Sequence, residues 1–80
     1  MPEEELFKTD EQTDRTAIAD ALRDAANGVE AGDVRLHSET GEQSVTVPAN
    51  PRFEVELERL TDSKTGEQRY ELEYEIRWTR

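Results

Sequence analysis

Glutamates at alternate positions are the residues of this chain with the clearest potential for chemistry. They fall in two runs near the C-terminus, interleaved with apolar residues: Glu54, Glu56, Glu58, Glu71, Glu73 and Glu75. Alternation of this kind is typical of a strand with one buried face and one wet face. If the two strands pair, their carboxylates share one sheet face. Such a face could dock a basic partner or imitate the phosphates of a nucleic acid.

Paired carboxylates can also perform acid–base catalysis, which requires burial or a cleft to separate their pKa values. An open sheet face offers neither, and a solvated, salt-adapted surface accounts for the same pattern without any site. The serines have no nucleophile-elbow context and the glycines do not form a phosphate-binding loop. We therefore expect no catalytic residues and no enzymatic activity.

A metal or cofactor site is also not expected. His37 is the only histidine and the chain has no cysteine, whereas metal sites need several converging ligands. His37 and Arg35 alternate with the apolar Val34 and Leu36, so His37 is expected to face outward with Arg35, and no loop has calcium-binding spacing. An open sheet of this size leaves little room for a small-molecule pocket.

We expect the aromatic residues near the C-terminus to form part of the hydrophobic core. Tyr70, Tyr74 and Trp78 alternate with the last glutamates and, with Phe53, are expected to lie under a helix, with Trp78 at the edge. If Trp78 is instead exposed, it becomes an anchor for self-association. The candidate partner-binding residues are thus the six glutamates and Trp78.

The net charge of the chain restricts the kinds of molecule that it is expected to bind. The chain has 80 residues, with 20 acidic against 10 basic residues and a formal net charge of −10. Such a surface repels a phosphate backbone, so we expect no direct nucleic-acid binding. Excess carboxylate with only two lysines, Lys8 and Lys64, suits a salt-rich cytoplasm. No apolar run approaches the ~20 residues that cross a bilayer, and we expect a cytoplasmic protein.

One helix is predicted from Asp14 to about Ala31, with Thr13 as N-cap and Gly32 as the C-terminal stop. Asn27-Gly28 is its weakest point, but the apolar spacing continues through it, so we expect one continuous helix. Its apolar stripe consists of Ile18, Leu22, Ala25 and Val29.

Four strands follow, at about 34–37, 45–47, 53–58 and 70–78, with a corner at Pro48 and Pro51. The sequence predicts a two-layer α+β domain over residues 1–80, with the helix packed on one face of a four-stranded antiparallel sheet. Residues 5–8 could add a fifth strand, with either Leu6 or Phe7 pointing inward. Residues 1–4 are expected to fray.

The second hairpin has two alternative registers. A two-residue turn at Thr65-Gly66 places Glu54 opposite Arg77, whereas a four-residue loop at 63–66 places Glu54 opposite Glu75. In both registers Glu56 and Glu58 face other glutamates, which is destabilising at low ionic strength.

The assembled pattern resembles the Amphi-Trp domain family, small proteins common in haloarchaea and also found in bacteria. The resemblance covers nearly the whole chain and rests on the order of its motifs and the closing Trp78. These motifs are Glu5-Leu6-Phe7, Ile18 to Arg23, Gly32 to Leu36, Gln43 to Pro48, Phe53 to Glu58 and the terminal glutamate-alternating strand. The resemblance supports a haloarchaeal setting and implies no catalytic or ligand-binding residue.

These observations lead to an expected function. We expect a small, acidic, non-enzymatic binding or regulatory module that acts through a protein partner or through self-association. The alternatives are a nucleic-acid mimic or other charge-based binder of a basic protein, and an accessory subunit of an enzyme complex.

Overall fold

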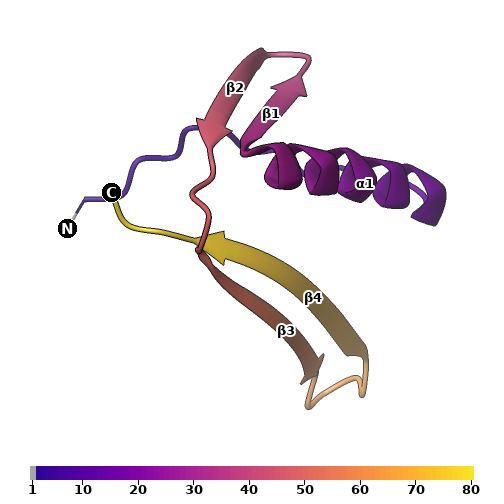
Figure 1. The fold of residues 1–80 in the computed structure, drawn as a ribbon. Helices are drawn as coiled ribbons and strands as arrows, with labels where there is room; N and C mark the ends of the chain where they lie inside the picture. The colour runs from indigo at the N-terminus through magenta and orange to yellow at the C-terminus, as the bar shows by residue number, and fades with distance from the viewer. Residues whose placement is uncertain (1) are drawn as a thin grey trace. The chain divides into compact units, whose positions relative to one another are not determined.

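The computed structural model describes residues 2–80 and contains one α-helix followed by four β-strands (Figure 1). Helix α1 comprises Arg15–Ala31, and the strands are β1 Asp33–Ser38, β2 Gly41–Thr46, β3 Arg52–Thr61 and β4 Gln68–Arg77. The strands pair as two antiparallel hairpins. The predicted α+β class with antiparallel strands is confirmed.

The strands form two two-stranded sheets, β1-β2 and β3-β4, where the sequence predicted one four-stranded sheet. One compact unit ends at Ala49 and the other spans Asn50–Arg80. Short turns bring neighbouring strands together, but alternation alone does not specify which hairpins pair with each other. Pro48 and Pro51 lack amide N–H donors, so the connection from β2 to β3 cannot extend a ladder.

The residues before the helix form no regular element. Residues 2–14 are in neither helix nor strand, so the fifth strand that the sequence suggested at 5–8 is absent. Leu6 is 66% exposed, whereas Phe7 is half-buried and is the more inward residue of the two. The expected fraying of residues 1–4 falls partly on residue 1, which lies outside the described residues.

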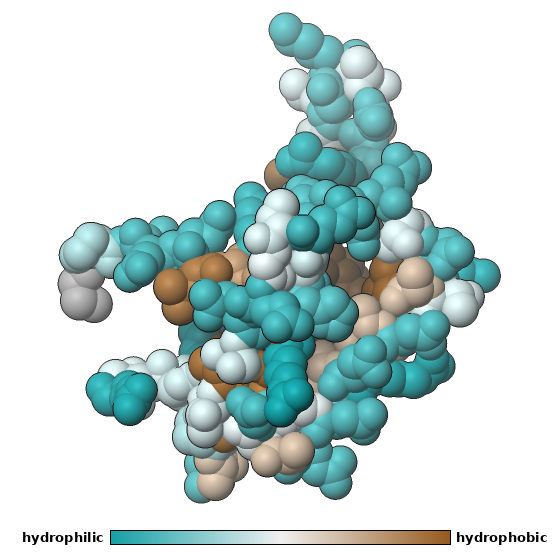
Figure 2. Space-filling model, turned by 90° about the horizontal axis from the view of Figure 1, so that it is seen from above, coloured by the Kyte–Doolittle hydropathy of each residue, from teal (hydrophilic) through white to brown (hydrophobic). Residues whose placement is uncertain are grey.

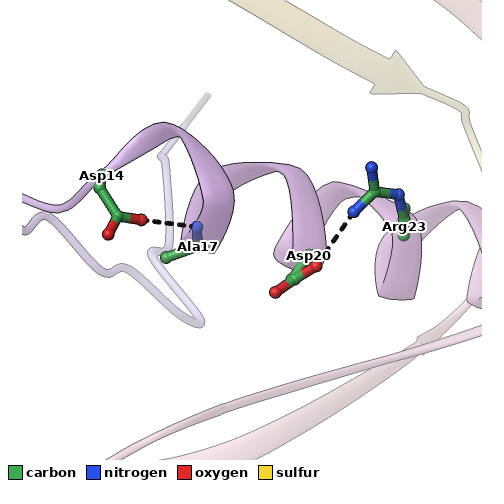
Figure 3. Close-up of polar contacts among 4 residues, drawn as sticks. All are labelled: Asp14, Ala17, Asp20 and Arg23. Atoms are coloured by element: carbon green, nitrogen blue, oxygen red, sulfur yellow. Dashed lines mark hydrogen bonds and ion pairs between the residues drawn. The ribbon is translucent and has the colours of Figure 1, made fainter.

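Asp14, and not Thr13 as predicted, caps the start of the helix. Its backbone is extended, and its side-chain Oδ1 accepts a hydrogen bond from the amide of Ala17 at 2.8 Å (Figure 3). Asp is at least as good an N-cap as Thr, and its carboxylate also favours the positive end of the helix dipole. One turn further on, Arg23 donates to Asp20 at 3.0 Å on the exposed surface.

The helix ends at Gly32, as predicted, and runs without a break through Gly28. Gly32 has a left-handed backbone, and its amide donates to the carbonyls of Gly28 and Val29. A Cβ on Gly28 would lie 3.0 Å from the carbonyl oxygen of Asp33 and 3.2 Å from the Cα of Val34. Glycine therefore lets β1 approach the helix backbone closely, which a sequence pattern cannot reveal.

In the N-terminal unit, α1 contacts β1 near the helix C-terminus. Val34 pairs with Val45 across the first hairpin. Val47 follows β2, and its amide donates to the carbonyl of Gly32 at 3.0 Å. Val47 is the only buried hydrophobic residue in the described chain, and hydrophobic side chains reach the surface in Figure 2.

Candidate interaction surface

The predicted glutamate face forms on the second hairpin. Strands β3 and β4 pair in the register of the four-residue loop, with Glu54 opposite Glu75, Glu56 opposite Glu73 and Glu58 opposite Glu71. Directly opposed residues of an antiparallel pair share a face. All six candidate glutamates therefore lie on one side of this two-stranded sheet, called the acidic face below.

The loop itself selects this register. The Asp62 carboxylate accepts hydrogen bonds from the amides of Lys64 at 2.8 Å and Thr65 at 3.1 Å, and the amide of Gly66 donates to the Asp62 carbonyl. Gly66 has a φ of 75°, which glycine adopts without strain. An Asp four residues before a Gly is a turn signal that could have decided between the two registers from sequence.

Two arginines partly neutralise the acidic face. Arg77 donates to Glu54 at 3.1 Å and lies 3.2 Å from Glu75, so it joins the first cross-strand pair of glutamates. Arg69 lies 3.6 Å from Glu71 near the other end. The sequence placed Arg77 opposite Glu54 only in the register that does not form, whereas in the observed register Arg77 lies opposite Arg52 and reaches Glu54 diagonally.

The centre of the acidic face has no such neutralisation. Among residues 2–80, no basic side chain lies within ion-pair distance of Glu56, Glu58 or Glu73. The pKa of Glu56 is raised from 4.5 to about 7, because its protonated form can donate a hydrogen bond to Glu58 and because the charges of Glu58 and Glu54 disfavour its ionisation. These carboxylates can attract a cation or share a proton, but they line an open strand face and not a cleft.

The opposite side of the hairpin is called the apolar face. Cross-strand pairs on it include Phe53 with Ile76, Val55 with Tyr74 and Leu57 with Leu72. The rings of Phe53 and Tyr74 stack with centroids 6.2 Å apart. Its apolar residues are exposed by 36–69%: Phe53, Val55, Leu57, Tyr70, Leu72, Tyr74, Ile76 and, just after β4, Trp78.

This exposure differs from the expected core under the helix. Tyr70 and Tyr74 retain 60% and 55% of their surface, and Trp78 retains 37%. Alternation correctly separated the two faces of the hairpin. It could not show whether anything covers the apolar one.

The N-terminal unit holds a shallow groove of about 620 Å³. Phe7 and residues 8–11 line it together with Ala25 of α1 and Leu36 of β1. His37 also borders the groove and is exposed, as is Arg35, with which it was predicted to face outward. Within residues 2–80, no three His, Asp or Glu side chains are grouped so as to hold a metal ion.

No helix of the described residues is both long enough and apolar enough to cross a bilayer. Comparison with curated proteins and with solved structures found no match. The family model described as the Amphi-Trp domain, in contrast, matches residues 1–80. The match spans the helix, both hairpins and the closing Trp78 on which the resemblance rested, and the chain therefore belongs to the Amphi-Trp domain family.

Proposed function

We propose that this protein is a small non-enzymatic binding or regulatory module that works in a salt-rich cytoplasm. The observation that supports it is the second hairpin, whose two faces differ completely in character and are both accessible. Its most perturbed carboxylate, Glu56, lies on an open strand face, which suits recognition better than acid–base chemistry.

For the first unit we propose that α1 packs on one face of its sheet, the β1-β2 face that carries Val34 and Val45. The close approach of Gly28 to Val34 supports this arrangement.

For the partner, we propose a basic protein surface that docks on the acidic face. Glu56, Glu58 and Glu73 lie next to one another without basic side chains of their own, so a partner could neutralise them without breaking an existing ion pair. Charge complementarity of this kind steers association and weakens with salt.

A titration of the full chain with an arginine-rich peptide tests the acidic-face proposal. We expect binding that weakens steeply as KCl is raised. The triple variant Glu56→Gln, Glu58→Gln, Glu73→Gln should weaken binding by about tenfold or more. The matched control changes Glu3, Glu4 and Glu5 to Gln, which alters the net charge equally outside the hairpin.

The control should leave the affinity nearly unchanged. If both triple variants lose affinity equally, binding follows net charge alone and the acidic face is not a specific surface. If wild-type binding is insensitive to salt, the charge-based proposal is wrong.

An accessory subunit of an enzyme complex is the second candidate. The exposed apolar face is the observation that favours it, because a stable subunit contact requires such a surface. In this case a different protein would cover the apolar face, and the chain alone would stay monomeric.

A further inference from the structure

The apolar face of the second hairpin exposes large hydrophobic side chains that are expected to be buried against another surface. An isolated two-stranded hairpin is at best marginally stable in water, and such sheets gain stability by packing an apolar face. Here Leu57 is 69% exposed, Phe53 64% and Leu72 59%. These side chains lie in directly opposed rows and form one continuous surface.

The size of this face matches a protein interface. An aromatic side chain can bury about 150–250 Å², so Phe53, Tyr70 and Tyr74 each still expose roughly 100 Å² or more at their exposures of 55–64%. With Val55, Leu57, Leu72 and the rest, the face presents on the order of 800 Å². This is about the area that each partner contributes to a standard-size interface.

A second copy of the chain offers a surface that matches this face in extent and in chemistry. A second copy of the same hairpin presents an identical face, and such self-complementary contacts are the basis of two-fold dimers.

The charge distribution also suits pairing through this face. The ladder places one charged residue on it, Arg59, which lies opposite Tyr70 towards the loop end. The six glutamates point to the other side. Sheets that pack face to face lie about 10 Å apart, so the two acidic faces would be separated by more than the Debye length of about 8 Å at physiological ionic strength.

We propose that the chain forms a homodimer in which the apolar faces of two β3-β4 hairpins pack against each other, with both acidic faces turned outward. The dimer rests on the apolar face alone and does not depend on the acidic face binding a basic partner. Trp78, 37% exposed at the end of β4, becomes covered at the edge of this interface.

Sedimentation equilibrium of the full-length chain tests the dimer. We expect twice the 9.2 kDa chain mass at micromolar concentrations in physiological and in multimolar KCl. Because Trp78 is the only tryptophan, its fluorescence should shift to shorter wavelength as the concentration is raised. A monomer at every concentration and salt level, with no such shift, would overturn the proposal.

Leu57→Lys locates the interface. Because Leu57 is 69% exposed in the chain, the change should not disturb the monomer, but it places a charge in the dimer contact. We expect the dimer dissociation constant to rise by about tenfold or more. The matched control Glu58→Gln changes the net charge equally on the opposite face of the same strand, and it should leave the dimer intact.

Leu72→Lys, directly opposite Leu57, provides a second variant if the first alters the helix content measured by circular dichroism. A dimer that resists both lysine substitutions would use another surface, such as a strand edge. This result would overturn the face-to-face arrangement.

Discussion

Gly28 lies in α1 directly against the backbone of β1. Alanine is favoured over glycine inside a helix by about 1 kcal/mol, so helix propensity alone predicts that Gly28→Ala stabilises the protein. The backbone of β1 nevertheless lies within 3.0–3.2 Å of the position that the new Cβ would occupy. We infer that the contact outweighs the propensity.

We expect Gly28→Ala to lower the stability by about 1 kcal/mol, because overpacking against backbone atoms commonly costs about 1–3 kcal/mol. Thermal unfolding followed by circular dichroism measures the change. The control is Gly41→Ala in β2, where no atom lies within 4 Å of the added Cβ and no loss is expected. A Gly28→Ala protein more stable than wild type would show that β1 can move away from α1.

The raised pKa of Glu56 leads us to expect an unusual dependence of stability on pH. Its pKa is about 7 in the folded hairpin against an ordinary value of 4.5, so the folded state binds a proton more tightly than the unfolded state between these values. Lowering the pH from 8 to 5 should therefore raise the melting temperature. The gain should be complete near pH 4.5 and lost as the pH rises through about 7.

Glu56→Gln should flatten this profile, because the glutamine is neutral throughout. Melts at pH 5, 6, 7 and 8 compare the variant with wild type. The range stays above the region where Asp62 matters, since loop amides lower the pKa of Asp62 below 3.8 and its contribution is lost only in more acidic solution. An unchanged slope in the variant would mean that other groups set the pH dependence.

At the scale of the element, the β3-β4 hairpin opposes like charges along much of its length. Glu56 faces Glu73 and Glu58 faces Glu71, without an arginine at the first of these pairs. Opposite charges at such positions stabilise a hairpin and like charges destabilise it. The acidic face therefore lowers the stability of the hairpin at low ionic strength.

Glu73→Lys should relieve this repulsion by placing a cation opposite Glu56. We expect the melting temperature at low salt to rise by about 2–5 °C, with the difference shrinking in molar KCl as the charges are screened. Glu3→Lys changes the net charge by the same amount outside the hairpin and serves as the control. Equal gains in both variants would attribute the effect to net charge and not to the cross-strand pair.

At the scale of the whole molecule, the net charge of −10 on 80 residues sets the response to salt. Self-repulsion among 20 acidic residues opposes folding, and screening over roughly 3 Å at about 1 M salt removes most of it. Salt also strengthens the burial of apolar surface when the ions are excluded from it.

We therefore expect the melting temperature of the whole protein to rise between low and multimolar KCl, by several degrees or more. Melts at a series of KCl concentrations measure this gain, and matched ionic strengths of guanidinium chloride serve as a contrast because that salt denatures. A melting temperature independent of KCl would contradict the proposal that the protein works in a salt-rich cytoplasm.

The sequence by itself determined the helix, its glycine stop, four strands in two hairpins, and the separation of glutamates from apolar residues. These features depend on residues close together in the chain, whose periodicity and turn chemistry are visible in the order of the letters. The N-cap was placed one residue too early, at Thr13 instead of Asp14, because both residues are acceptable caps.

Only the tertiary structure decided which residues meet across longer separations. It established that Glu54 faces Glu75, that Arg77 joins both, that Gly28 lies against Val34, and that pairing stays within each hairpin. The apolar face illustrates the difference most clearly. Alternation shows that Leu57 and Leu72 share one side with the aromatic residues, whereas their exposure depends on what packs against them, and that is a property of distant contacts and not of local pattern.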